Sequence, residues 1–203
     1  MSESQAIATE LEEVVPGIWA WSVTDERIGD FVGSSFAVET DQGTVLVDPH
    51  RVEGFERLLP LQAIVLTTSG HQRSSWRLRR EHGTPVWAPE GVQELDEQPD
   101  HHYGEGTELP GGLRAVFTPG AGTRQHTLLL DRDGGVAFVP DLLVMPPGGN
   151  LGLIPDEYAH DPAQARETTR KLLDLPFDVL CLGHGGHVGG DAKARIREEA
   201  LSE

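Results

Sequence analysis

The sequence has a single cysteine, no long apolar run and about half as many basic residues as acidic ones. Cys181 cannot form an internal disulfide alone, which fits a reducing compartment. No segment approaches the roughly 20 consecutive apolar residues that a membrane-spanning helix needs. Residues 1–13 are polar and acidic, unlike the basic and then apolar pattern of a secretory signal. We therefore expect a cytoplasmic protein without a membrane partner.

The shortage of basic residues gives the chain a formal net charge of −17 at pH 7. Because this field repels phosphate backbones, we do not expect nucleic acid as a partner. A chain of 203 residues is long enough for one domain that buries about 70% of its unfolded surface. We predict a flexible N-terminus over residues 1–13 and a single domain over residues 14–203.

Four hydrophobic runs end abruptly, within two residues of a polar side chain. The runs cover residues 45–47, 64–66, 136–139 and 179–182, and the polar residues that follow are Asp48, Thr67, Asp141 and His184. Such runs are typical of buried strands, and in α/β sheets reactive groups collect where strands end. The sequence therefore predicts that these four side chains lie near one another.

Helix signals appear in three places. Ser74 and Ser75 predict an N-cap for a helix that runs through Glu81 and stops at Gly83. Asp161, followed by Pro162 and Gln164, predicts a second capped helix, and a third is predicted from Asp191 onward. Residues 93–112 are rich in acidic residues, glycine and proline, which predicts a loop with a short helix at residues 92–96. The order of elements favours two mixed sheets with helices outside both.

Five short segments together resemble the metallo-β-lactamase superfamily. They are residues 44–49 (TVLVDP), 63–73 with 83–89 (GTPVWAP), 117–120 (FTPG), 138–141 (FVPD) and 182–185 (LGHG). They occur in the family's order, and the resemblance spans residues 15–197. Residues 151–157 and 184–190 also resemble a bacterial branch with a degenerate hallmark motif. The resemblance implies an α+β fold, a four-layer αββα sandwich, with zinc or iron ions at one edge and hydrolytic activity.

The family's metal ligands match this sequence at few positions. Its hallmark is His-x-His-x-Asp-His, and when Thr67 is placed on the threonine before it, the ligand positions hold Thr68, Gly70, Gln72 and Arg73. A shift by one residue restores only His71. Ala121 falls at the position of the next metal histidine, and His126 lies five residues later. By this resemblance, Asp141 and His184 remain at ligand positions, with Asp48 as structural support.

Two remaining ligands are fewer than the three that a catalytic zinc site usually takes from the protein. Arg73 also places a permanent positive charge at a ligand position, which opposes a dication. We hypothesise that Arg73 pairs with Asp141 and replaces the metal. This interpretation predicts no metal cofactor and a non-catalytic descendant that binds a small molecule or a protein in the old cleft.

Two alternatives stay open. In the first, a rebuilt mononuclear site of His71, Asp141 and His184, with His126 as a further candidate, holds one zinc, iron or manganese ion and supports hydrolysis. In the second, a serine near His184 acts as a metal-free nucleophile, the candidates being Ser69, Ser74 and Ser75. No Gly-x-Ser-x-Gly motif accompanies them. The sequence specifies neither the substrate nor the oligomeric state.

Overall fold

The hydrophobic runs of the sequence are strands with both faces buried. In the computed structural model, which describes residues 4–24 and 32–202, Val45 and Val47 belong to one hydrophobic cluster and Leu46 to another. Phe138 and its neighbour Ala137 are separated in the same way. Successive side chains of a strand point to opposite faces, so a strand covered on both sides needs an uninterrupted apolar run.

Two β-layers enclose the central hydrophobic cluster. The first layer contains β2 (Glu12–Val15), β3 (Ile18–Thr24), β4 (Val32–Thr40), β5 (Gly43–Val47), β7 (Leu61–Val65), β8 (Val86–Pro89) and β9 (His101–Tyr103). The second contains β10 (Leu113–Phe117), β11 (His126–Leu130), β12 (Val136–Val144), β13 (Gly152–Leu153), β14 (Val179–His184) and β15 (Gly186–Val188). A separate parallel pair joins β1 (Ile7–Ala8) to β6 (Arg51–Val52).

The two layers are connected through a narrow seam. The hydrogen-bonded strand order is β10-β11-β12-β14-β4-β5-β7-β8-β9, with β3 on the other side of β4. Strand β14 meets β4 at the pair His184–Gly33, whereas β4 and β5 pair over five positions. The seam therefore lies at the carboxyl end of β14, at the predicted site residue His184.

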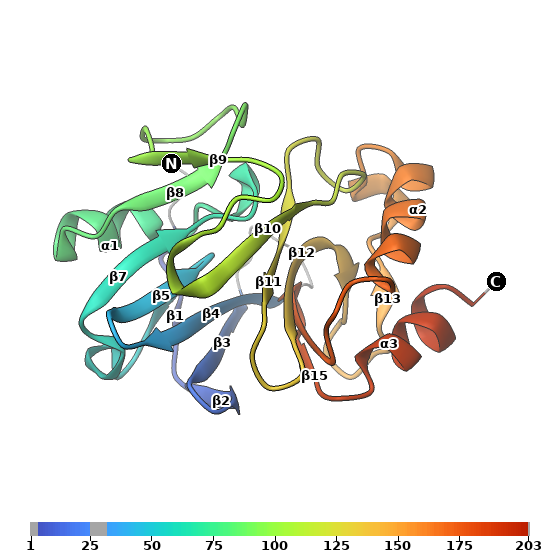
Figure 1. Ribbon diagram of the computed structural model, residues 1–203, viewed down its shortest axis with the longest axis horizontal. Coiled ribbons are helices and arrows are strands. Elements are labelled where there is room, and N and C mark those ends of the chain that lie inside the picture. Colours follow the sequence, from blue (N-terminus) through green and yellow to red (C-terminus); the bar gives the residue numbers. More distant parts are fainter. Residues whose placement is uncertain (1–3, 25–31, 203) are drawn as a thin grey trace.

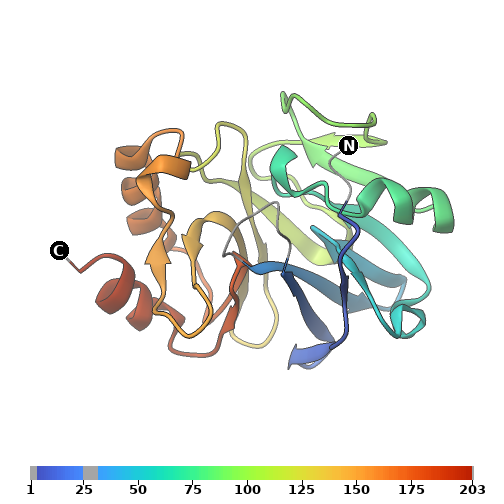
Figure 2. The same ribbon diagram turned by 180° about the vertical axis from the view of Figure 1, so that it is seen from behind.

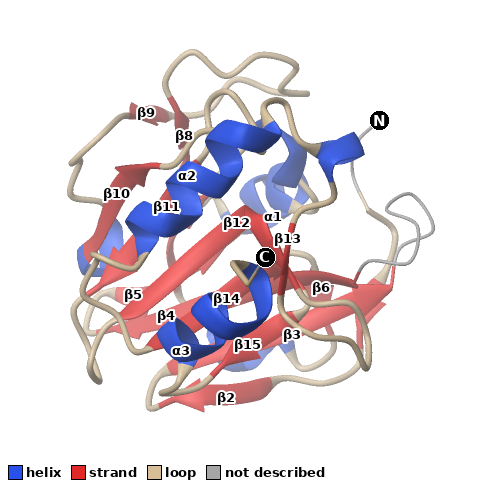
Figure 3. Cartoon of the chain, turned by 90° about the vertical axis from the view of Figure 1, so that its right-hand side faces the viewer, coloured by secondary structure: helices blue, strands red, loops and turns tan. Residues whose placement is uncertain are grey.

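Helices cover the outer faces of both layers (Figures 1 and 2). Helix α1 (Ser75–His82) packs Trp76 and Leu78 on the first layer. Helices α2 (Pro162–Leu172) and α3 (Ala192–Arg195), the latter continued by the π-helical turn η6 (Ile196–Ala200), cover the second layer (Figure 3). Short 3-10 turns are η2 (Phe55–Leu58), η3 (Ser69–His71), η4 (Pro110–Gly112) and η5 (Asp156–Tyr158). Within the described residues, no helix is long and apolar enough to span a membrane.

This arrangement confirms the predicted four-layer αββα sandwich. The predicted cap of α2 is also confirmed, because Asp161 Oδ1 accepts a hydrogen bond from Gln164 N at 3.0 Å. Gly83 ends α1 as expected, in the left-handed conformation with φ of 67°.

The predicted serine cap of α1 is wrong. Ser74 precedes the helix but makes no side-chain capping bond, since its ψ of 12° is far from the extended backbone that capping requires. The first turn is instead held through the backbone, where Ser74 N donates to Pro49 O and Ser75 N to Gln72 O.

The expectations for two other segments also differ from the structure. Residues 92–96 form no helix, because Asp96 N donates to the Gln72 side chain and Glu94 has a left-handed φ of 63°. The predicted loop over residues 93–112 also contains β9 and η4. Within the predicted flexible N-terminus, β1 and part of β2 are formed, while residues 1–3 lie outside the described residues.

Substitution of Gly120 by alanine tests the packing of α2. Gly120 has φ of 129°, and a Cβ there would lie 2.4 Å from Ala165 N in α2. We expect Gly120→Ala to lower the free energy of unfolding by about 3 kcal/mol, because the backbone is strained and the helix must shift. Urea denaturation measures the loss.

The matched control is Gly148→Ala, where φ is 68° but nothing lies within 4 Å of the added Cβ. Its cost is the left-handed strain alone, about 1 kcal/mol. Equal losses in the two variants would contradict the packing argument.

Candidate metal centre

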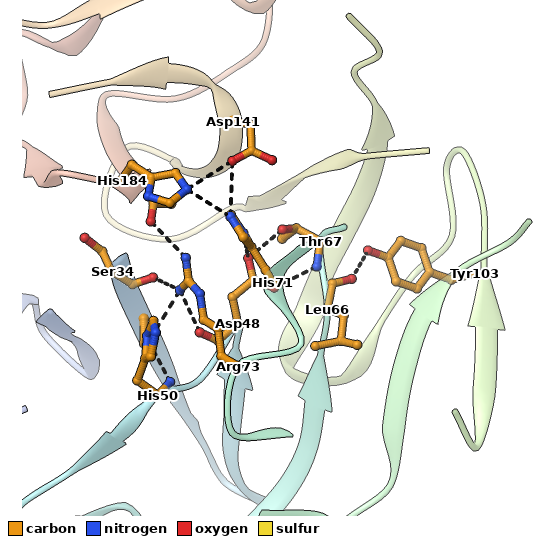
Figure 4. Close-up of polar contacts among 12 residues, drawn as sticks. Ser34, Asp48, His50, Leu66, Thr67, His71, Arg73, Tyr103, Asp141 and His184 are labelled. Carbon is orange, nitrogen blue, oxygen red and sulfur yellow. Dashed lines mark hydrogen bonds and ion pairs between the residues drawn. The ribbon is translucent and has the colours of Figure 1, made fainter. Parts of the chain in front are cut away.

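Three side chains from distant parts of the sequence meet at the seam between the layers (Figure 4). His71 Nε2 lies 3.1 Å from Asp141 Oδ1 and 3.2 Å from His184 Nε2. His184 Nε2 lies 3.2 Å from the same oxygen of Asp141. We call these residues the trio. They are the one group of metal-binding side chains that converges in the described part of the chain.

Asp48 fixes the orientation of His71 from behind. Its carboxylate accepts hydrogen bonds from Thr67 N at 2.8 Å, Thr67 Oγ1 at 2.5 Å and His71 Nδ1 at 2.9 Å. Because Nδ1 donates to Asp48, the Nε2 atom of His71 is the one that faces the trio. A carboxylate that holds the far nitrogen of an imidazole is the usual support of a metal-binding histidine.

Close backbone packing brings His184 to His71. At Gly183 an added Cβ would lie 2.7 Å from His71 Cε1 and 2.6 Å from Pro140 O. At Gly185, where φ is 116°, an added Cβ would lie 2.2 Å from Met145 O, so no side chain fits there. The two glycines around His184 are therefore required by the approach of β12 and β14.

Arg73 lies beneath the trio and does not pair with Asp141 as hypothesised. Its guanidinium donates to the carbonyl oxygens of Ser34, of Asp48 at 2.8 Å and of Gly183 at 2.9 Å. No ion pair joins Arg73 to Asp141, although both belong to the described residues. The backbone of Arg73 is left-handed, with φ of 46°, and this conformation directs the side chain toward these carbonyl groups.

The charges of the site act on one another. Burial raises the pKa of Asp141, but the charge of His71 and the hydrogen bonds from both histidines outweigh it and hold this pKa well below its usual range. Burial lowers the pKa of His71, but Asp141 and Asp48 outweigh it, so the net shift is upward. The pKa of His184 is lowered, first by burial and then by the nearby charges of His71 and Arg73.

Comparison with protein families agrees with this architecture. A family model described as the metallo-beta-lactamase superfamily matches residues 12–202. The chain belongs to the metallo-beta-lactamase superfamily. No curated protein matches the sequence.

Solved structures with the same fold include several members of this superfamily. A metallo-beta-lactamase from Pontibacter korlensis is 18% identical with a TM-score of 0.76, covering 98% of this chain and 100% of that chain. DIM-1 metallo-beta-lactamase exposed to ceftazidime is 14% identical with a TM-score of 0.77, covering 95% and 96%. ST1585, an archaeal superfamily protein from Sulfolobus tokodaii, is 17% identical with a TM-score of 0.68, covering 84% and 81%. At these identities the likeness shows the fold alone.

The trio has the donor atoms and the spacing of a tetrahedral metal site. Two imidazole nitrogens and a carboxylate oxygen are a common zinc donor set, and their separations of 3.1 to 3.2 Å match the ~3.3 Å between ligands in a tetrahedron with bonds of ~2.0 Å. His71, which belongs to the alternative mononuclear site predicted from the sequence, reaches the same point as Asp141 and His184.

The other predicted residues lie elsewhere. His126 is buried at the start of β11, with its ring 5.2 Å from that of Tyr103, and it is not part of the trio. The hydroxyls of Ser74 and Ser75 are buried, with no hydrogen-bond partner among the described residues, so neither can reach a substrate. Ser69 borders a cavity beside the site.

Several residues that support the site were not predicted from the sequence. Ser34 Oγ accepts from Gly186 N at 2.8 Å, and Ser35 Oγ lies 3.0 Å from His50 Nδ1. Tyr103 donates to Leu66 O at 2.6 Å, and burial raises its pKa well above the usual value. Two adjacent serines in an otherwise apolar buried strand, β4, were the one visible signal.

Replacement of Arg73 tests its role at the seam. We expect Arg73→Met to lower the free energy of unfolding by about 3–5 kcal/mol, because three buried carbonyls lose their donor. Urea denaturation measures the loss. The control Arg170→Met, on the exposed side of α2, should stay within about 0.5 kcal/mol of wild type. A similarly small effect at Arg73 would show that the guanidinium does not stabilise the seam.

Proposed function

We propose that this protein is a hydrolase with a single metal ion held by His71, Asp141 and His184. One observation carries the proposal: three ligand atoms lie 3.1 to 3.2 Å apart, and Asp48 supports the first of them from behind. Three protein ligands also leave a position open, as catalytic sites do and structural sites do not.

The charges of the site favour a dication more than the sequence suggested. Histidines bind a metal ion in their neutral form. With both histidines neutral, Asp48 and Asp141 bring two negative charges and Arg73 one positive charge, so a net charge of one negative unit faces the ion. Asp141 is ionised over the physiological range because its pKa is held so low. The guanidinium of Arg73 is turned toward backbone carbonyls, so its donor groups do not compete with an ion for the Asp141 oxygens.

A zinc, iron or manganese ion at the trio would supply the Lewis acidity that activates water and polarises a carbonyl or phosphoryl group. The residues of the chain have the preparatory roles. Asp48 keeps His71 in one tautomer and one orientation. Asp141 and His184 are 21% and 15% exposed, so the open side of the site can admit water and substrate.

A second candidate function is supported by the hydrogen bonding of the trio. Its three groups satisfy one another directly, and the raised pKa of His71 favours a proton there. A proton can therefore hold the trio together in place of an ion. In that case the protein is the non-catalytic binder of a small molecule or a protein partner, in the same cleft.

Metal analysis separates the two functions. After reconstitution with zinc, manganese or ferrous iron and removal of free ions, we expect about one ion per chain by mass spectrometry. His71→Ala, Asp141→Ala and His184→Ala should each bind less than about a tenth as much, because two ligands rarely hold an ion. Hydrolysis of a panel of esters, thioesters, lactones and phosphodiesters should follow the metal content.

His187→Ala is the matched control, since this imidazole lies three residues after His184 but outside the trio. It should bind metal like wild type. If wild type binds no ion after reconstitution, the hydrolase proposal is wrong and the non-catalytic function is favoured.

Removal of the charge behind His71 tests the supporting role of Asp48. Asp48→Asn keeps an oxygen that can accept from Thr67 but loses the carboxylate that holds the imidazole. We expect metal affinity to fall about 10- to 100-fold, measured by competition with a chromogenic chelator. An unchanged affinity would mean that His71 needs no support.

A further inference from the structure

A cavity of about 600 Å³ lies beside the loop that carries His71. Thr68 and Ser69, just before His71, form one side of it. Residues 91–94 form a second side, and residues 122–124 with His160 form a third. A ligand in this cavity is therefore next to the candidate metal centre.

Gln72, which is 3% exposed, connects the cavity wall of residues 91–94 to the loop that carries His71. Its Nε2 donates to Glu94 O at 3.0 Å, and its Oε1 accepts from Asp96 N at 2.7 Å. The same oxygen accepts from Trp76 Nε1 at 2.7 Å. The residue adjacent to His71 thus fixes the position of the cavity wall.

The cavity wall of residues 122–124 is held in place by Gln125, which is fully buried. Its Oε1 accepts from Gly122 N at 2.9 Å, and the next residue, His126, donates its backbone N–H to Thr67 O at 3.0 Å. Arg124 lies between these two anchored points. The backbone of Arg124 is therefore held at a fixed place beside the loop that carries His71.

The guanidinium of Arg124 spans the two walls. An added Cβ at Gly91 would lie 3.4 Å from both Cζ and Nε of Arg124, so the planar group rests against the backbone of the first wall. Arg124 is exposed, and although its backbone is hydrogen-bonded to the His126 side chain, its guanidinium makes no hydrogen bond or ion pair with the residues that the structure describes. Its five N–H donors are left for a ligand, and a guanidinium fork matches carboxylate and phosphate oxygens.

We propose that this cavity binds an anionic group of the substrate, a carboxylate or a phosphate, through Arg124. Glu94 lines the same cavity, and its negative charge limits the total negative charge that a ligand can carry there. That the anion belongs to a hydrolysed substrate rests on the proposed function, whereas anion binding by the cavity does not depend on metal.

The test is a titration of the full chain, freed of metal ions by dialysis, followed by amide NMR. The probes are succinate, inorganic phosphate and the uncharged analogue succinamide. We expect saturable shifts of the Gly91 and Gly122 amides with a charged probe and none with succinamide. Arg124→Gln should weaken binding about tenfold or more, and Glu94→Gln should strengthen it.

Arg170→Gln is the control for a general loss of positive charge and should bind like wild type. Arg124 and Glu94 are exposed, so their variants should keep the wild-type melting temperature. A response to succinate alone assigns carboxylate substrates, and one to phosphate alone assigns phosphate substrates. Equal affinity in Arg124→Gln, equal binding of succinamide, or shifts confined to other regions would overturn the proposal.

The outcome is separable from that of the metal analysis. Anion binding in a chain that never takes up metal would support this subsite and refute the hydrolase. Metal binding without anion binding would refute the subsite and leave the hydrolase standing.

Discussion

The buried guanidinium of Arg73 holds the two β-layers together where they meet. Strands β14 and β4 pair antiparallel at His184–Gly33, and Arg73 donates to the carbonyl groups of the two residues next to that pair, Gly183 on one strand and Ser34 on the other. A third bond reaches Asp48 O, at the end of β5. A buried positive charge is costly unless its donors are satisfied, so these three segments must remain in place. The position of the trio follows from this constraint.

The same constraint explains why a permanent cation can coexist with a candidate metal centre. Arg73 uses its donors on backbone, and the two carboxylates Asp48 and Asp141 surround its charge. The negative charge of the site therefore exceeds the positive charge. Asp48 connects the two systems, because its carbonyl accepts from Arg73 and its carboxylate accepts from His71.

Gln72, between His71 and Arg73 in the sequence, has a structural role of its own. The Gln72 amide, which the alignment with the family's hallmark places at the aspartate, is hydrogen-bonded to the backbone of residues 94 and 96. The residue next to it, His71, belongs to the trio. Three consecutive residues of one loop thus have three tasks: His71 belongs to the trio, Gln72 supports a cavity wall and Arg73 is a structural cation.

The sequence by itself determined the strands, two of the helix boundaries and the sandwich. Apolar runs that end at polar residues report burial on both faces, and Asp161 and Gly83 act through local backbone geometry. These signals depend on neighbours in the chain. The serine cap and the short helix at residues 92–96 failed because distant groups took over the backbone, namely the Pro49 carbonyl and the Gln72 side chain.

Only the tertiary structure decided which polar residues form the site. The sequence left His71 as a ligand candidate of the alternative site and predicted that Arg73 pairs with Asp141, whereas in the structure His71 faces Asp141 and Arg73 faces backbone carbonyl groups. His71 and Arg73 are two residues apart in the sequence, yet their side chains have different partners. Arg73 has a left-handed backbone, whereas Asp48 holds the imidazole of His71 in place. The geometry of the trio depends on a 3-10 turn, the interior of β12 and the end of β14, which the fold brings within 3.2 Å of one another, and a linear motif records it only while the motif is intact.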